Sequence, residues 1–189
     1  MESNQINNIE VKDFEIVSPK VKKLFIMAIA LIGLSMNAQQ KPFIVNHIID
    51  KMTKKEYYLS TEKMIITNKE KSKGFTITPN LKFEDGKILL QAVTVKSFVG
   101  SSCVENNTLY ILLENDKLIT LKSWNKFNCE GTSYFDFTEE DLRLLSESKA
   151  IAIRFVNGRD YAQFENTPYA DQKDFFIRVL TNNKIVEVK

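Results

Sequence analysis

The chain has 189 residues, of which 43% are hydrophobic and 26% are charged. This composition is typical of a globular protein, and it excludes a disordered, collagen-like or multi-span membrane chain. The formal net charge is only +2, whereas a nucleic-acid partner would require a clear excess of clustered Lys and Arg. The chain contains a single histidine, which excludes most catalytic constellations built on an imidazole.

An export signal is the clearest feature of the N-terminal region. Lys22 and Lys23 precede an apolar run, residues 24–34, and small and polar residues follow up to Ala38. A basic segment, a short apolar segment and a small residue before the cleaved bond are typical of a secretory signal peptide. The run is too short to cross a bilayer, which requires about 20 apolar residues. A buried core helix is the alternative interpretation of this run.

Cleavage near Ala38 would divide the chain into two parts. We expect residues 1–38 to be an N-terminal extension and cleavable signal peptide, and residues 39–189 to be a single β-rich globular domain without a transmembrane span. Residues 1–20 are unusually polar for a signal peptide, so two translation starts fit the sequence, Met1 and codon 21. Either start predicts a periplasmic or secreted protein.

The leader contains Lys-Lys-Leu-Phe at residues 22–25, then the apolar run, and then Asn-Ala-Gln at residues 37–39. This pattern resembles the leaders of small exported proteins of unknown function from Bacteroidota-type bacteria. The resemblance is confined to the leader. It implies an envelope or secreted location, and it implies no activity.

Three turn motifs separate apolar runs in the domain: Asp85-Gly86, Asn115-Asp116 and Asn157-Gly158. Asp-Gly and Asn-Gly between apolar runs are strong signals of two-residue β-hairpins. In the last hairpin, a two-residue turn would place Arg154 opposite Tyr161 as a cross-strand cation–π pair. Stretches rich in β-branched and aromatic residues predict further strands at 57–59, 64–67, 75–78 and 133–137.

Two helices are predicted in the second half of the chain. Thr138 is a typical N-cap before an acidic first turn, residues 139–141, and a leucine stripe follows up to Ser148. Thr167-Pro168 predicts a second helix over 168–181, with proline at the first helical position. Successive hairpins followed by helices indicate an α+β fold. It is mainly antiparallel β, as a sheet or sandwich of hairpins, with two helices in the C-terminal half.

Cys103 and Cys129 are the only cysteines, and in an exported protein an even count predicts a disulfide. If the turn at 115–116 has two residues, Tyr110 faces Leu121 and Cys103 faces Asn128. A longer turn or one β-bulge would place the two cysteines opposite each other. We therefore predict a disulfide at the open end of this hairpin. The spacing does not fit a redox-active pair, because no Cys-x-x-Cys motif occurs.

The segments beside the cysteines, residues 100–108 and 124–132, form the candidate binding surface. A tryptophan beside amide side chains is a common feature of sugar and peptide sites, because the ring stacks while the amides form hydrogen bonds. The candidate binding residues are Trp124, Asn125, Asn128, Asn106 and Asn107. Two other interpretations are open: Trp124 is a core residue, and the asparagines form turns.

The sequence predicts no catalytic, cofactor-binding or metal-binding residue. His47 alone cannot supply the several nitrogen or sulfur ligands of a zinc site, and Asp136 with the acidic residues 139–141 has a structural interpretation in a strand and a helix start. We expect an exported non-catalytic binding or structural module of the envelope or secreted fraction, with an unknown protein, peptide or glycan as ligand. The alternatives are a small carboxylate-dependent hydrolase and an inhibitor- or immunity-type protein.

Overall fold

The computed structural model describes residues 41–188 of the chain. The predicted extension, the signal peptide and its cleavage site near Ala38 lie outside the described residues. The strands are β1 (Phe43–Ile49), β2 (Glu56–Ser60), β3 (Met64–Thr67), β4 (Gly74–Glu84), β5 (Lys87–Ser97), β6 (Thr108–Leu113), β7 (Leu118–Lys122), β8 (Thr132–Asp136), β9 (Ala150–Val156), β10 (Gln163–Asn166) and β11 (Asn183–Glu187). The helices are α2 (Glu139–Glu147), the 3₁₀ turn η1 (Ala170–Gln172) and α3 (Phe175–Thr181).

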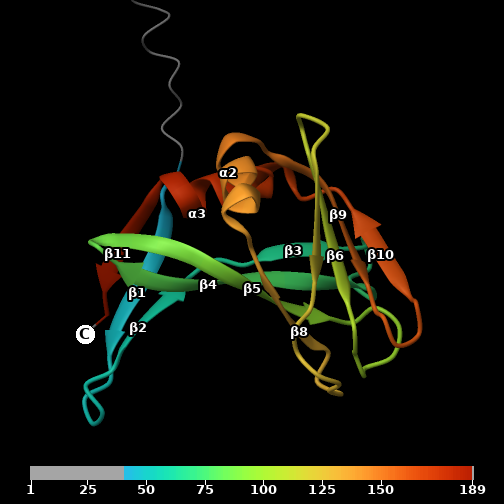
Figure 1. Cartoon of the computed structure of the whole chain (residues 1–189), viewed down its shortest axis with the longest axis horizontal. Helices are drawn as coiled ribbons and strands as arrows, with labels where there is room; N and C mark the ends of the chain where they lie inside the picture. Colours follow the sequence, from blue (N-terminus) through green and yellow to red (C-terminus); the bar gives the residue numbers. More distant parts are fainter. Residues whose placement is uncertain (1–40, 189) are drawn as a thin grey trace, which may run out of the picture. The chain divides into compact units, whose positions relative to one another are not determined.

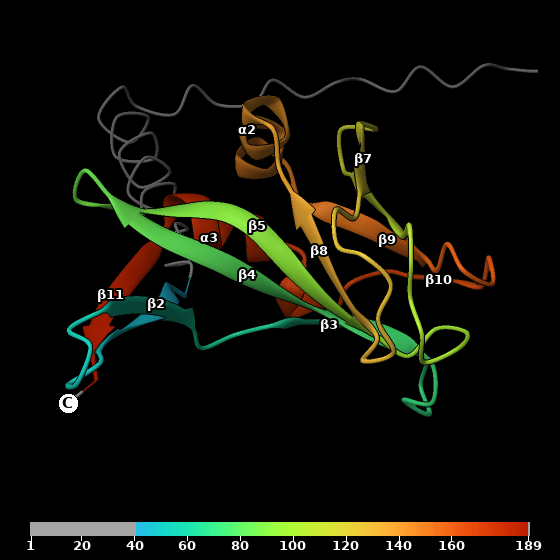
Figure 2. The ribbon, with the colours of Figure 1, turned by 60° about the horizontal axis from the view of Figure 1, so that its bottom comes forward.

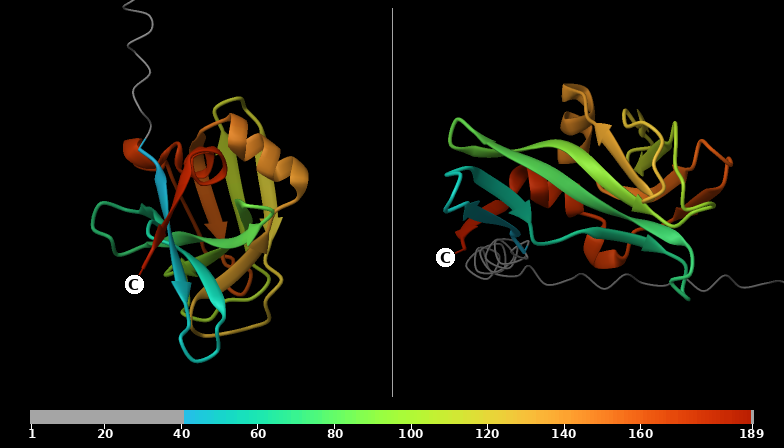
Figure 3. Two further views of the ribbon diagram at one scale, coloured as in Figure 1. Left: turned by 90° about the vertical axis from the view of Figure 1, so that its left-hand side faces the viewer. Right: turned by 90° about the horizontal axis from the view of Figure 1, so that it is seen from below.

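The strands form two sheets (Figure 1). A seven-stranded sheet has the order β11-β1-β2-β4-β5-β8, and β3 also pairs with β4; a four-stranded sheet has the order β10-β9-β6-β7. All pairs are antiparallel except β1 with β11, which are parallel. The longest elements are β4 and β5, which form one hairpin (Figure 3). The predicted α+β fold, mainly antiparallel with two late helices, is confirmed.

The core joins both sheets and the helices through phenylalanine rings. Phe75 of β4 lies 5.7 Å from Phe155 of β9, measured between ring centroids. Phe175 of α3 meets Phe43 of β1 edge to face at 5.5 Å. Helix α3 thus packs against the seven-stranded sheet, and α2 packs against α3 (Figure 2). Burial of these side chains is the main stabilising contribution to the fold.

The first predicted turn is confirmed. Glu84 pairs with Lys87, so Asp85 and Gly86 alone form the loop between β4 and β5. Their φ angles are 50° and 77°, the positive values that a type I′ turn requires at both central residues. Asp tolerates this conformation and Gly adopts it freely. Local sequence therefore determines this hairpin.

The register predicted for the hairpin at residues 115–116 is wrong. Leu113 accepts a hydrogen bond from the Asp116 N–H and donates its own N–H to Lys117 O, and Asp116 has a φ of 61°. This is the three-residue loop, in which a tight turn is followed by a left-handed residue. Tyr110 consequently faces Thr120 instead of Leu121.

The hairpin predicted at Asn157-Gly158 is also wrong in its register. Val156 pairs with Gln163, so residues 157–162 form a longer loop. Arg154 therefore lies opposite Glu165, to which it is ion-paired, and its guanidinium lies 5.9 Å from the Tyr110 ring. Tyr161, its predicted partner, is 82% exposed. The cause is Asn157, whose buried side chain binds a different loop.

Of the two predicted helices, the first is confirmed and the second begins later than expected. Thr138 caps α2 in a capping box, in which its side chain accepts from the Asp141 N–H and the Asp141 side chain accepts from the Thr138 N–H. Pro168 lies outside α3, which starts at Phe175 after the 3₁₀ turn. The Gln172 side chain holds that turn, because it accepts from the Ile65 N–H of β3 at 3.0 Å.

The strands β1 and β11 are not among the predicted strands. Asn46 and His47 interrupt the apolar run of β1, so its alternation is weak in the sequence. The strand β11 is short and mostly exposed, and its residues show no apolar alternation. Their pairing is between the two ends of the described chain, which local sequence patterns do not encode.

Candidate functional site

Cys103 and Cys129 form a disulfide with an S–S distance of 2.02 Å. Next to it, Val104 and Asn128 exchange two backbone hydrogen bonds of 2.8 and 3.2 Å. This pair places the two cysteines opposite each other at the open end of the β6–β7 hairpin, so the predicted disulfide is present. The predicted cause is not: the strands pair Thr108 with Lys122, and the segment between Lys122 and Asn128 is two residues longer than the segment between Val104 and Thr108. A crosslink here joins the chain before β6 to the chain before β8.

The disulfide is part of a group of three loops, residues 98–107, 123–131 and 157–162, which we name the disulfide loop cluster. Asn157 is fully buried, and its Nδ2 donates to the backbone oxygen of Cys103 at 3.1 Å. The Gly158 N–H donates to Asn107 Oδ1 at 3.1 Å. Hydrogen bonds from the third loop thus fix the loop that carries Cys103.

Gly158 allows a backbone contact that no other residue would permit. A Cβ atom at this position would lie 2.3 Å from the backbone oxygen of Asn106 and 2.4 Å from that of Glu105. These distances are far inside van der Waals contact, and backbone atoms cannot move aside as a flexible side chain can. The glycine is therefore required by the approach of the two loops.

The carboxylate of Asp160 connects the loop at residues 157–162 to the loop at residues 98–107. Oδ2 accepts from the Ser101 N–H at 2.6 Å, and Oδ1 accepts from the Ala162 N–H at 3.0 Å. These two backbone hydrogen bonds, that of Ser101 first, lower the pKa of Asp160 below its usual value. The ionised carboxylate is thus the form that stabilises the contact between the loops.

Three of the predicted binding asparagines have structural partners. Asn107 is buried and donates to Ser133 Oγ at 2.8 Å. Asn125 accepts from the Tyr134 N–H at 2.9 Å and donates to Thr132 O at 3.1 Å, and Asn128 also donates to Thr132 O, at 2.8 Å. The alternative that asparagines shape the loops holds for these contacts. Asn106 is exposed, with a φ of 50°.

Trp124 is 62% exposed, so it is not a core residue. Its ring stacks on Tyr134, with ring centroids 5.1 Å apart and the planes inclined by 23°. Its Nε1–H donates to Asp136 Oδ1 at 3.2 Å, and its backbone N–H donates to Tyr134 O at 3.2 Å. Three contacts therefore hold Trp124: the Tyr134 ring covers one face of the indole, Asp136 binds its edge, and the main chain binds the main chain of Tyr134.

A second exposed aromatic side chain belongs to the same loop as Trp124. Phe127 is 47% exposed, and the guanidinium of Arg159 lies 4.8 Å from the centre of its ring. This cation–π contact links the second loop to the third. Only the contacts across the fold reveal this part of the surface, because Phe127 and Arg159 are far apart in the sequence.

The other residues considered for chemistry have structural partners. His47 Nε2 lies 3.0 Å from Glu56 Oε2, and its ring stacks on Tyr58 at 4.7 Å. Glu140 is ion-paired with Arg143 at 2.7 Å, and the hydrogen bond from Arg143 lowers the pKa of Glu140. Between residues 41 and 188, no cluster of three or more His, Cys, Asp or Glu side chains could hold a metal ion.

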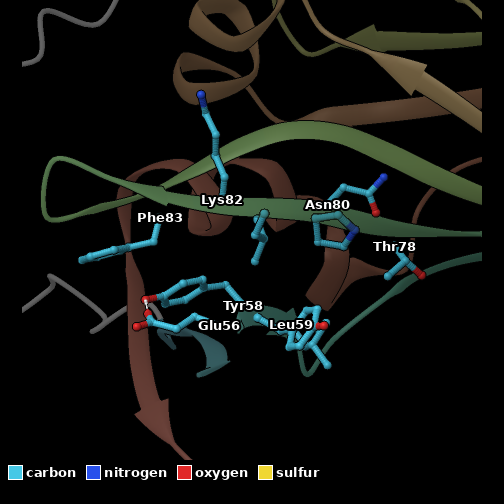
Figure 4. Close-up of a pocket in the computed structure, with 10 residues that line it drawn as sticks. Glu56, Tyr58, Leu59, Thr78, Asn80, Lys82 and Phe83 are labelled. Carbon is cyan, nitrogen blue, oxygen red and sulfur yellow. Dashed lines mark hydrogen bonds between the residues drawn. The ribbon is translucent and has the colours of Figure 1, made fainter. Parts of the chain in front are cut away.

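A slot between β2 and β4 is a further concave feature, and the sequence does not predict it (Figure 4). The two strands pair only at Leu59 and Asn80, and beyond that point they separate around a volume of about 570 Å³. Tyr58 and Phe83 stack at 5.1 Å at one end of the slot, and Glu56 accepts from the Tyr58 hydroxyl at 3.0 Å. Burial, and then this hydrogen bond, raise the pKa of Tyr58.

No protein-family model, curated protein or solved structure matches the chain. Within the described residues, no helix is long and apolar enough to cross a membrane.

Proposed function

We propose that the protein is an exported, non-catalytic binding module whose ligand contacts the disulfide loop cluster at Trp124. The observation that supports this is an exposed tryptophan whose ring stacks on Tyr134 and whose Nε1–H donates to Asp136. Large exposed aromatic side chains are typical of interaction sites, where they contribute much of the binding energy. A surface that is ordered before binding loses less conformational entropy when the ligand arrives.

Export is supported by two independent features. The basic and apolar pattern before Ala38 is typical of a signal peptide. The disulfide between Cys103 and Cys129 is compatible with an oxidising compartment, whereas cytosolic thiols are usually kept reduced. The proposed location is the periplasm or the extracellular space. Mass spectrometry of the exported protein tests this directly, and a mature N-terminus upstream of the apolar run would contradict it.

The binding proposal is tested by retention on envelope material. The purified protein, with its disulfide intact, is sedimented with the insoluble envelope fraction of the bacterium that carries the gene. We expect Trp124→Ala to reduce the retained protein at least tenfold, because the change removes the exposed ring. Tyr57→Ala is the matched control: Tyr57 is also an exposed aromatic residue, but it lies on β2 beside the slot.

The melting temperature of both variants should stay within a few degrees of the wild type, since neither ring is in the core. Equal retention of the wild type and Trp124→Ala would contradict the proposal. Loss of retention in Tyr57→Ala alone would also contradict it, and would indicate that the ligand binds at the slot between β2 and β4. A carboxylate-dependent hydrolase is not favoured, because both carboxylates have structural partners. Asp160 accepts hydrogen bonds from two backbone N–H groups, and Asp136 accepts one from the Trp124 ring.

A further inference from the structure

The part of the Trp124 ring that a ligand can reach is defined by its contacts. Tyr134 covers one face, and Asp136 binds the Nε1–H at the edge. The 62% exposure of the residue therefore belongs to the opposite face and the rim. A flat apolar surface is thus presented to solvent, with a carboxylate at its margin.

The sheet beside this ring is polar. The register of β5 with β8 places Thr94 opposite Tyr134 and Lys96 opposite Thr132, and directly opposed residues project from the same face of a sheet. The next strand, β4, continues this row with Thr78 opposite Thr94, and Thr94 Oγ1 donates to Asn80 Oδ1 at 3.0 Å. The ligand surface thus combines one exposed indole with hydroxyl, amide, ammonium and carboxylate groups.

We propose, on the basis of the binding function above, that the ligand of this surface is a glycan, with a pyranose ring stacked on Trp124. A pyranose has an apolar face of C–H groups that stacks on an aromatic ring, and hydroxyls around its rim that form hydrogen bonds. The Asp136 carboxylate at the edge of the indole accepts such hydroxyls, and charged acceptors form the stronger hydrogen bonds. Apolar contact plus a few placed polar groups is the usual composition of a small-ligand site.

The local charges disfavour the other ligands that stack on tryptophan. A cationic peptide would be attracted to Trp124 and Asp136, but two exposed lysines oppose it. Lys96 lies on the adjacent row of β5, and Lys126 is two residues from Trp124 in the same loop. An apolar or proline-rich peptide would require apolar neighbours along its length. The adjacent row on β4 and β5 consists of threonine, asparagine and lysine apart from Ala92, which is opposite Asp136 and is buried. A neutral or acidic glycan matches both properties.

Chemical treatment of the envelope fraction tests the ligand class. Periodate cleaves the vicinal diols of sugars, whereas proteinase K removes proteins and peptides. We expect retention of the wild-type protein to survive proteinase K and to fall at least tenfold after periodate. Retention that survives periodate and is lost after proteinase K would overturn the glycan proposal, and the binding function through Trp124 would stand. Failure of the untreated fraction to retain the protein through Trp124 would overturn both.

Fluorescence gives a second and direct measurement, because Trp124 is the only tryptophan of the chain. Soluble glycan released from the proteinase-treated fraction should shift the emission to shorter wavelength in a saturable way, since a stacked sugar removes water from the indole. Asp136→Ala keeps the fluorophore and should weaken the apparent affinity at least tenfold. Tyr57→Ala should titrate like the wild type. No shift with the glycan, or a shift with deca-lysine or deca-proline instead, would overturn the assignment.

Discussion

The two edges of the seven-stranded sheet differ in whether other parts of the chain cover them. At one edge, β8 is covered by the loop at residues 123–131, where Trp124 and Asn125 bind the backbone of Tyr134 and Thr132 as a neighbouring strand would. At the other edge, β11 pairs with β1 alone within the described residues, and its side chains are mostly exposed. Unpaired strand edges can pair with other chains, so β8 is a protected edge and β11 is an open one.

The protected edge lies beside the disulfide loop cluster, and the edge residues Tyr134 and Asp136 of β8 hold Trp124 in place. Order at this edge therefore serves the proposed binding surface as well as the sheet. The open edge has no such support: its neighbours in the β1–β2 hairpin carry exposed Ile49 and Met52. We infer that local stability is greater at the edge that carries Trp124 than at the edge formed by β11.

Removal of the disulfide should have the largest effect. The bond closes a loop between residues 26 positions apart, and a crosslink of this span stabilises a protein by about 3 kcal/mol. Replacement of Cys103 and Cys129 by serine should lower the free energy of unfolding by this amount, as measured by urea denaturation. Hydrogen exchange should increase more in the disulfide loop cluster than in β2, because the lost crosslink also frees the cluster to open locally. Equal increases at both ends would show that the cluster is not a local unit.

A methyl group at Gly158 should have the next largest effect. The added Cβ would lie 2.3 Å from the Asn106 backbone oxygen, and overpacking of this kind costs about 2 kcal/mol. Gly86→Ala is the matched control, because a Cβ added there would meet no atom within 4 Å and only the positive φ is unfavourable. In urea denaturation, Gly158→Ala should have a lower free energy of unfolding than Gly86→Ala. The reverse order would contradict the close contact of the loops.

Sequence alone determined the features whose cause is local. The Asp85-Gly86 turn and the α2 capping box depend on a few neighbouring residues, and both were predicted at the correct positions. Asn157-Gly158 carries an equally strong local signal, but the buried Asn157 side chain binds the loop of Cys103 and lengthens the turn. Tertiary hydrogen bonds therefore override turn propensity at that position.

The candidate site was predictable in part for the same reason. An exported chain with two cysteines predicts their pairing, and a tryptophan in a polar segment is a natural candidate for a ligand contact. Exposure, however, is a property of the folded chain. The sequence therefore allowed two interpretations of Trp124, a core residue and a surface residue. The slot at β2 and β4 depends on the angle between two strands, which no residue pattern in either strand encodes.

Substitutions at the two edges should differ by about 1 kcal/mol. Asn125→Ala leaves the Tyr134 N–H and the Thr132 carbonyl without their side-chain partners, and loss of partners for half-buried backbone groups costs about 1–2 kcal/mol. Ile185→Thr changes an exposed side chain of β11 and should stay within about 0.5 kcal/mol of the wild type. Thermal denaturation of both variants measures the difference. Equal melting temperatures would mean that solvent replaces Asn125 at the protected edge.

The smallest effect concerns the response of the disulfide loop cluster to acid. The pKa of Asp160 is lowered in the folded protein, first by the Ser101 N–H and then by that of Ala162. Its stabilising contribution is therefore complete above the pKa of the unfolded chain, about 3.9, and is lost as the pH falls through the lower folded value. Because the carboxylate is exposed, we expect Asp160→Ala to cost only about 1 kcal/mol at neutral pH. The difference in unfolding free energy between wild type and variant should be constant from about pH 5 to pH 7 and shrink as the pH falls below about 4. A difference that stays constant down to about pH 2 would show that Asp160 does not bind the loop as a carboxylate.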